Sequence, residues 1–489
     1  MSDATGAKSP AAMVEACRAE LARRPDHADT WYDLGYYARR AGAYEDALDA
    51  YAKALSLGIR NPWEVHLNRA VIYSDDLRRD QAARAELERA LALKPDYLAA
   101  KLNLGNLLEE QGEKCEARAV YEAMLEAFSP DGPPGRDHDM RLEALARLAG
   151  LVRPDSPDDP VLRRLAASAQ RPRTRDPHVA ANLSFALGRA LDGFGAYDAA
   201  FAALKLANAR AAATAPAYQP ERTQHLFEEI AASVARLKRP GGQPHAPGVR
   251  PLFICGMFRS GSTLAERVLD SHSKVVGGGE LNLLTQLVAS RLAPFPQAMG
   301  QASLADLATL AETYRSRAIQ IFPEAVDAAY LADKRPDNFL LAGLALTLFP
   351  DAKVINTVRN PLDVGISIYS HNIDPRVTPY ATDLAAIGHY ISLYRALMAH
   401  WKSRFPGAVH DFDYDAFVRE PEPELAKLLA FLGLDWEPEC LDFHTRRATV
   451  KTASYWQIRE PLHARASGRW RNYERHLEPL RRALGDHGG

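Results

Sequence analysis

A glycine-bracketed turn in residues 251–280 constrains the fold of this chain more than any other feature. The apolar run at 252–254 is typical of a buried parallel strand. Gly256 and Gly261 follow and indicate a tight loop, after which the pattern predicts a helix over about 263–270. A strand, a glycine-rich loop and a helix in this order present backbone N–H groups and a positive helix end to a phosphate.

The composition of this loop favours one kind of anion. Its spacing, G-x-x-x-x-G-S-T, matches a nucleotide-binding P-loop except that Ser262 stands where the lysine is expected. That lysine and Mg²⁺ neutralise a triphosphate, whereas a sulfuryl group carries one negative charge fewer and needs no metal for transfer. Arg259 inside the loop therefore suits a phosphosulfate, and Ser260, Ser262 and Thr263 are candidates to cap the helix. A glycine-rich turn that binds nothing would show the same local pattern.

Length and composition limit the class of protein. A chain of 489 residues predicts two or three domains, and its net charge of −2 gives no reason to expect nucleic acid or an anionic membrane as a partner. No apolar run approaches the roughly 20 residues that span a bilayer, and the N-terminus lacks a signal-peptide pattern. The cysteines are too scattered for a disulfide framework or a zinc site; they are Cys17, Cys115, Cys255 and Cys440. We expect a soluble, cytoplasmic protein in which Cys255 is a small buried strand residue.

The N-terminal half repeats itself. Gly35, Val71 and Gly105 are equivalent positions separated by 36 and 34 residues, which is the tetratricopeptide period. Small residues stand where paired helices must approach, and large ones fill the gaps between them. The pattern predicts regular repeats over about 27–128 and a degenerate repeat over about 178–211.

These patterns divide the chain into two domains. We expect a helical repeat domain over 1–237, a proline- and glycine-rich linker over 238–250, and a second domain over 251–489. Stacked repeats form a concave surface that binds peptides or proteins. An array that only supports the second domain or promotes oligomerisation is the alternative.

Two charged residues of the second domain are candidates for catalysis. Glu280 follows three glycines and a short apolar run, 21 residues after Arg259, so it is expected at the same sheet edge as the loop. There it can act as a general base. Lys334 precedes a proline-initiated helix and can reach the bridging oxygen of a leaving phosphate. A solvated loop carboxylate and an ordinary loop lysine are the alternatives.

A further pair can hold a phosphate. Residues 352–358 read as a strand that ends at Arg359, and Ser367 lies two turns into the next helix. An arginine and a serine placed in this way can bind one phosphate together. A strand-capping arginine that pairs with Asp363 is the alternative.

Taken in order, these segments resemble the sulfotransferase family, most closely bacterial tetratricopeptide-repeat sulfotransferases and tyrosylprotein sulfotransferases. The segments that carry the resemblance are FALGRALDGFGAYDAAF, FRSGSTLAERVLDSH, GGGE, DKRPDNF, VRNPLDVGISIYS and TASYWQIREPLHARASGRWRNYE. The implied fold is α + α/β, an N-terminal tetratricopeptide solenoid followed by a P-loop-like α/β domain with a parallel sheet. The implied donor is 3′-phosphoadenosine 5′-phosphosulfate, used without a metal.

The resemblance assigns roles to individual residues. It makes Glu280 the base, and it gives Lys334, Ser454 and Arg259 the stabilisation of the transition state. Arg359 and Ser367 would hold the 3′-phosphate, whereas His371 stands where the tyrosylprotein branch has a second phosphate-binding arginine. The remaining donor contacts would be Arg259, Ser260, Gly261, Ser262 and Thr263 in the loop, with Tyr414, Ser454, Arg459 and Arg469 further on. Arg469 replaces a lysine of that branch. His272 is a rival base, because small-molecule sulfotransferases use a histidine.

Several alternatives remain at this stage. The acceptor hydroxyl could belong to a protein or peptide tyrosine, to a saccharide or to a small molecule. A P-loop kinase is a different enzyme class, and a repeat scaffold that carries an inactive nucleotide-binding domain is a non-enzymatic one. The oligomeric state is open.

Overall fold

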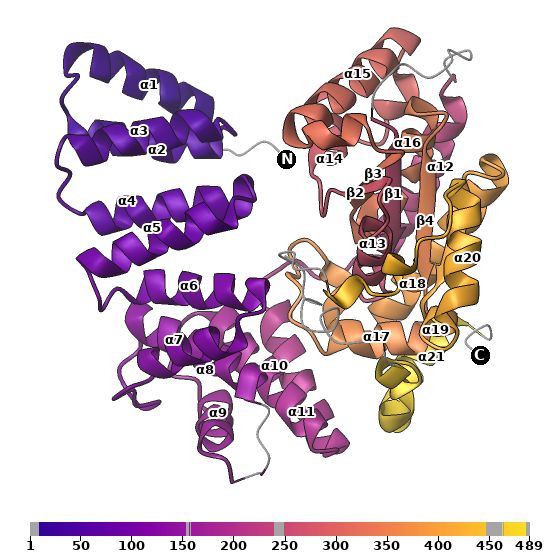
Figure 1. Cartoon of the computed structure of the whole chain (residues 1–489). Helices are drawn as coiled ribbons and strands as arrows, with labels where there is room; N and C mark the ends of the chain where they lie inside the picture. Colours follow the sequence, from indigo (N-terminus) through magenta and orange to yellow (C-terminus); the bar gives the residue numbers. More distant parts are fainter. Residues whose placement is uncertain are drawn as a thin grey trace. The chain divides into compact units, whose positions relative to one another are not determined.

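The computed structural model divides into two compact units, Met1–Val179 and Ala180–Gly489 (Figure 1). The residues that it describes are 9–152, 156, 158–238, 249–445, 462 and 464–485. Among them, no helix combines the length and the apolar character that a membrane crossing requires.

The first unit is built from helices joined by short turns. Its helices are α1 (Pro10–Arg23), α2 (Ala28–Arg40), α3 (Tyr44–Ser56), α4 (Pro62–Val71), α5 (Asp80–Leu93), α6 (Leu98–Gln111), α7 (Lys114–Met124), α8 (Arg136–Val152) and α9 (Pro160–Gln170), with a π-helical turn η1 (Ile72–Asp76) after α4. Consecutive helices contact one another from α1 to α9, as expected for a stacked array in which each hairpin buries its apolar face against its neighbours.

A small residue facing a large one recurs in these hairpins. A Cβ on Gly35 would lie 2.7 Å from the Tyr51 ring, and one on Gly105 would lie 2.4 Å from the Tyr121 ring. The two pairs have the same spacing in the sequence, and both tyrosines are fully buried. The tetratricopeptide interpretation of this region is therefore confirmed at the level of side-chain packing.

The division between the two units differs from the expected domain boundary. The helices α10 (Pro177–Gly193), α11 (Tyr197–Ala212) and α12 (Pro220–Arg236) were assigned to a repeat domain ending at residue 237. α10 and α11 do form a repeat-like hairpin, in which Gly188 faces Leu204. Their apolar faces, however, share one hydrophobic core with the sheet of the second unit, and the Asn208 side chain donates a 2.8 Å hydrogen bond to the carbonyl of Tyr369. The expected linker lies largely outside the described residues.

The second unit is organised around a five-stranded parallel sheet, in the order β2-β3-β1-β4-β5. The strands are β1 (Pro251–Gly256), β2 (Val275–Gly277), β3 (Tyr330–Lys334), β4 (Lys353–Val358) and β5 (Val409–Asp413). Because all strands run in one direction, their carboxyl ends meet at one edge, where open α/β sheets bind their ligands. The expected α/β domain with a parallel sheet is confirmed.

Helices cover both faces of this sheet. They are α13 (Ser262–Asp270), α14 (Leu283–Arg291), α15 (Leu304–Ile321), α16 (Ala342–Leu348), α17 (Pro361–Tyr369), α18 (Leu384–Arg404), α19 (Tyr414–Phe417), α20 (Pro421–Leu432) and α21 (Glu478–Leu484). Short 3₁₀ segments join them: η2 (Met299–Gln301), η3 (Pro323–Val326), η4 (Pro336–Leu340), η5 (Pro379–Thr382), η6 (Pro438–Cys440), η7 (Phe443–Thr445), η9 (Ala464–Ala466) and η10 (Arg469–His476).

Strand alternation decides which face each side chain of β1 and β3 meets. In β1, Leu252 and Ile254 pack in the core beneath α13 and α20, whereas Phe253 and Cys255 pack in the core beneath α15, α16 and α18. The same alternation in β3 sends Lys334 toward α13, and it sends Asp333 toward Tyr314 of α15. Cys255 is buried as expected, and burial raises the pKa of its thiol.

Candidate active site

The loop between β1 and α13 is closed tightly at both of its glycines. Gly256 has a φ of 151°, and a Cβ there would lie 2.3 Å from the hydroxyl of Thr357 in β4. Gly261 has a φ of 106°, and a Cβ there would lie 2.6 Å from the ring of Tyr414. Both positions require glycine, because L side chains rarely adopt this backbone conformation and the space beside them is filled.

The cap of α13 differs from the expected one. Gly261 is the N-cap residue and no side chain of the described residues caps the helix, so the expected capping by Ser260, Ser262 or Thr263 is wrong. The Ser260 hydroxyl instead lies 2.6 Å from both the carbonyl of Met257 and the hydroxyl of Thr357, and it braces the loop against β4. A helix start of this kind can direct its first N–H groups toward an anion.

Two arginines lie together at this loop, one within it and one at the end of β4. Arg259 has a φ of 69°, and its Nε donates a 3.2 Å hydrogen bond to Ser367 Oγ. Arg359 donates a 3.0 Å bond to the Arg259 carbonyl, and its guanidinium lies 4.9 Å from the centre of the Tyr414 ring. Burial, and then the positive charge of Arg359, lower the pKa of Arg259 to about 10. Positive charges brought so close together favour an anionic ligand.

One donor in this cluster points to a ligand directly. The Nε of Arg359 is buried and has no hydrogen-bond partner among the described residues. A buried polar group without a partner costs free energy unless a ligand satisfies it. The predicted phosphate pair, Arg359 and Ser367, thus lies together beside the loop. The alternative pairing of Arg359 with Asp363 is not what the structure has: the Asp363 carboxylate accepts the backbone N–H groups of Gly468 and Trp470.

A third arginine, Arg189, lies near this cluster, and its neighbour there is His371. The ring of His371 donates a 2.7 Å hydrogen bond from Nδ1 to the Ser367 carbonyl. Burial, followed by the charges of Arg259 and Arg189, holds the pKa of His371 well below its ordinary value, so the ring is neutral near pH 7. Arg189 belongs to α10, whose Asn182, two turns earlier, is hydrogen-bonded to Asn372 beside His371. The segment FALGRALDG contained this arginine, but a helix interpreted as part of the repeats gave no reason to place it near Arg259 and His371.

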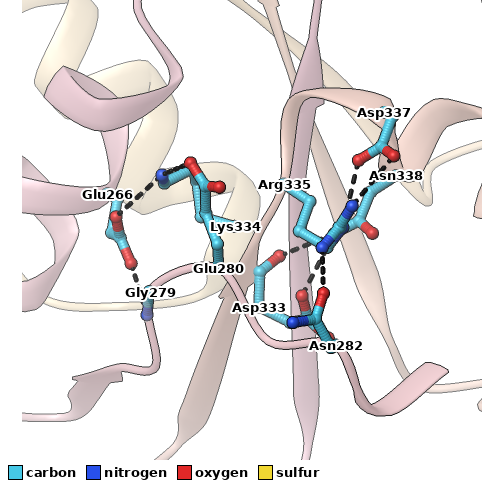
Figure 2. A network of polar contacts seen from close by, with 9 residues as sticks. All are labelled: Glu266, Gly279, Glu280, Asn282, Asp333, Lys334, Arg335, Asp337 and Asn338. Carbon is cyan, nitrogen blue, oxygen red and sulfur yellow. Dashed lines mark hydrogen bonds and ion pairs between the residues drawn. The ribbon is translucent and has the colours of Figure 1, made fainter. Parts of the chain in front are cut away.

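Two more of the predicted catalytic residues, Glu280 and Lys334, form an ion pair near the ends of β2 and β3. Lys334 Nζ donates a 2.7 Å hydrogen bond to Glu280 Oε1 (Figure 2). The lysine side chain is 1% exposed and the glutamate side chain is 37% exposed, so the carboxylate is the partner that solvent can reach. Lys334 Nζ also lies 3.8 Å from Oε2 of Glu266, a buried residue of α13 that the sequence analysis did not identify.

A second set of contacts fixes the turn that carries Glu280. The guanidinium of Arg335 forms two 3.0 Å hydrogen bonds with the Asp337 carboxylate and a third contact with the side-chain oxygen of Asn282 (Figure 2). Lys334 contacts Glu280 and Arg335 contacts Asn282, so the same two segments are joined twice.

The rival base, His272, lies elsewhere. It follows the C-terminal end of α13, whereas the phosphate loop precedes the N-terminal end, about 13 Å away along a helix of this length. The ring is 2% exposed; its Nδ1 accepts the N–H of Lys274 and its Nε2 donates to the Asp435 carbonyl. Both ring nitrogens are engaged in holding neighbouring backbone.

The remaining predicted residues are less informative. Arg469, at the start of η10, forms an ion pair with Asp192 of α10. Ser454 and Arg459 lie outside the described residues. Ser262 and Thr263 are buried in the first turn of α13, and Tyr414 packs against Gly261 as described above.

An arginine-lined loop before a helix, at the carboxyl edge of a parallel sheet, is the arrangement with which P-loop-like α/β domains hold anionic groups. Comparison with known families makes this specific: residues 251–438 match the model of the sulfotransferase family, and residues 14–62 and 75–133 match a tetratricopeptide repeat. The chain therefore carries tetratricopeptide repeats followed by a sulfotransferase domain.

Individual relatives share parts of the chain. An uncharacterised protein of Aquifex aeolicus is 38% identical over 259 residues, which are 50% of this chain and 33% of that protein. A protein-tyrosine sulfotransferase of Drosophila melanogaster is 24% identical over 45% of this chain and 46% of its own length. An omega-hydroxy-beta-dihydromenaquinone-9 sulfotransferase of Mycobacterium bovis is 30% identical over 30% of this chain and 42% of its own length. The matched part thus spans a third to about half of each of these relatives.

One solved structure can be set beside these sequences. The sulfotransferase domain of the Synechococcus PCC 7002 olefin synthase has 18% identity and a TM-score of 0.36, covering 48% of this chain and 91% of that one.

Proposed function

We propose that the chain transfers a sulfuryl group from 3′-phosphoadenosine 5′-phosphosulfate to an acceptor hydroxyl, with Glu280 as the general base. The observation that carries this proposal is the 2.7 Å pair between Glu280 and Lys334, at the same sheet edge as the arginine-lined loop. A proton acceptor and a cationic donor of hydrogen bonds are the two groups that an in-line transfer between oxygens requires.

The residues around the loop fit the donor. The first-turn N–H groups of α13 and the Arg259 side chain would hold the 5′-phosphosulfate. Arg359, whose buried Nε has no partner among the described residues, would hold the 3′-phosphate together with Ser367. That phosphate is the part of the donor that ATP lacks, so these two residues would set the specificity.

The proposed chemistry balances without a metal. Glu280 takes the proton of the acceptor hydroxyl while the new oxygen–sulfur bond forms. On the opposite side of sulfur, the bond to the bridging phosphate oxygen breaks, and Lys334 donates a hydrogen bond to that oxygen as its charge grows. Arg259 and the loop N–H groups stabilise the remaining sulfuryl oxygens. Ser454 is proposed to assist there, on the resemblance alone.

For the acceptor, we favour a tyrosine hydroxyl of a protein or peptide. Similarity to the protein-tyrosine sulfotransferase of Drosophila supports this choice, as do the tetratricopeptide repeats, which commonly bind peptides. Similarity to the mycobacterial menaquinone sulfotransferase supports a small-molecule hydroxyl as the second candidate. Action on the acceptor in the cytoplasm belongs to the same proposal, and fractionation of expressing cells tests it.

Calorimetry with 3′-phosphoadenosine 5′-phosphate, ADP and ATP, with and without Mg²⁺, tests the donor. We expect metal-independent binding that requires the 3′-phosphate. Preference for ATP with Mg²⁺ would instead favour a kinase, and no binding of any of the three would favour an inactive scaffold. Radiolabelled donor offered with tyrosine peptides, simple phenols and saccharides then identifies the acceptor class.

A further inference from the structure

A buried carboxylate that the proposed chemistry does not use lies on α13, the helix that follows the glycine-bracketed loop. Glu266 stands one turn inside α13 and is 7% exposed. Its Oε1 accepts the backbone N–H of Gly279 at 2.7 Å, and its Oε2 lies 3.8 Å from Lys334 Nζ. Figure 2 shows Glu266 and Glu280 on either side of the lysine head group.

This carboxylate is costly where it lies. Its neighbours on α13, among them Ala265, Val268 and Leu269, belong to the apolar core beneath the sheet. Burial raises the pKa of Glu266, and the negative charges of Asp270 and Glu280 act in the same direction; Lys334 and the Gly279 N–H oppose them. An apolar residue of similar size usually satisfies such a position at lower cost. A role in architecture alone therefore explains the glutamate poorly.

The charges around Lys334 suggest what the second carboxylate does. An ammonium group has three N–H donors. If Glu280 were its sole partner, Lys334 could turn toward a leaving oxygen only by losing its anchor. With Glu266 behind it, the ammonium group keeps one anionic partner while it directs another N–H toward the reaction, and Glu280 is released to accept a proton.

Glu266 also connects the parts of the site. It stands on the helix that begins at the phosphate loop, it bonds the residue immediately before Glu280, and it contacts the last residue of β3. These three segments come from separate parts of the chain, and one side chain holds their relative positions.

We propose that Glu266 is a positioning residue for the sulfuryl transfer, which holds Lys334 and the Gly279–Glu280 turn so that the lysine can serve the leaving group while the base stays in place. This inference rests on the proposed function.

The test combines kinetics with binding in the full chain. Glu266→Gln keeps an acceptor for the Gly279 N–H and removes the charge. We expect its kcat to fall about 10- to 100-fold, which is less than the roughly 10²- to 10³-fold loss caused by removing a direct donor to the transition state, while affinity for 3′-phosphoadenosine 5′-phosphate stays within about threefold of wild type. Asp270→Asn is the matched control. Asp270 lies on α13 one turn after Glu266, and its carboxylate likewise accepts a backbone N–H, that of Gly277. Its kcat should stay within about threefold of wild type.

A double-mutant cycle shows whether Glu266 acts through Lys334. In a Lys334→Met background, Glu266→Gln should lower kcat by less than about twofold, because the partner is already absent. An unchanged kcat in the single variant, or the same loss in both backgrounds, overturns the proposal. If Glu266→Gln melts at a temperature well below that of wild type, Glu266→Met is tested in its place. A folded Glu266→Met variant with the kcat of wild type also overturns the proposal. Wild type that binds no 3′-phosphoadenosine 5′-phosphate refutes the proposed function itself, and this inference with it.

Discussion

Lys334 and Glu280 meet at 2.7 Å although one side chain is 1% exposed and the other 37%. The pair is asymmetric, because the buried Lys334 has a second carboxylate, that of Glu266, 3.8 Å from its Nζ, whereas the Glu280 side chain is reached by solvent. Ion pairs with one buried member are weak arguments for stability but good candidates for function.

Replacing Glu280 with glutamine should remove turnover and spare donor binding. The amide keeps the size of the side chain and cannot accept a proton at neutral pH, so kcat should fall about 10²- to 10⁴-fold. Affinity for 3′-phosphoadenosine 5′-phosphate, measured by calorimetry, should not change. His272→Asn is the control: it loosens a structural contact and should lower the melting temperature while kcat stays near wild type. An active Glu280→Gln beside an inactive His272→Asn would mean that the base is His272.

Replacing Arg359 with alanine should abolish discrimination between donors. Hydrogen bonds to charged groups contribute about 1.5–3 kcal/mol, so affinity for 3′-phosphoadenosine 5′-phosphate should fall about 10- to 100-fold. Affinity for ADP, which has no 3′-phosphate, should stay the same. The affinity of Arg359→Lys for 3′-phosphoadenosine 5′-phosphate should lie between those of wild type and Arg359→Ala. Equal losses for both ligands would place Arg359 on a part of the donor that they share.

Arg189 should contribute to donor binding from α10. Its charge is felt by both Arg259 and His371, so we expect Arg189→Ala to weaken binding of 3′-phosphoadenosine 5′-phosphate about three- to tenfold and to reduce the dependence of binding on salt. Arg236→Ala, an exposed arginine near the end of α12, is the matched control. Identical salt dependence in both variants would show that Arg189 does not act on the ligand.

Asp333 should make the stability of the protein depend on pH. Burial raises the pKa of Asp333 to about 7, against the hydrogen bonds from Asn338 and Tyr314. A carboxyl whose folded pKa is raised contributes stability at low pH, and that stability is lost as pH rises through about 7. As the pH falls from 8 to 6, the melting temperature of wild type should therefore rise relative to that of Asp333→Asn. The rise should be roughly 2–4 °C for each kcal/mol added to the free energy of unfolding. Parallel curves for the two proteins would contradict this assignment.

The sequence supports some of these features well and others hardly at all. The repeat period places Gly35 opposite Tyr51 because helical hairpins pack by a fixed geometry. The carboxyl ends of parallel strands bring Glu280, Lys334 and Arg359 to one edge whatever the loops between them do. Glu266, by contrast, looks in the sequence like an ordinary polar residue of a helix, because its contact with Lys334 joins residues that are far apart along the chain.

Two other features depend on packing that no local pattern records. The serines around Gly261 carry a capping signal, yet the φ of 106° and the nearby Tyr414 ring make glycine the cap residue. The helices α10 to α12 have the small and large residues of a repeat, and such an apolar face can pack on another hairpin or on a sheet. In this chain it packs on the sheet domain.

That choice matters for how the protein can be divided or recombined. Cutting before residue 251, where the family match starts, would strip the sheet domain of the helices that contribute Phe185 and Ile230 to its interior, and would expose that interior to water. An exchange of repeat arrays between relatives should therefore join the chains near residue 176, so that α10 to α12 are inherited together with the sheet domain.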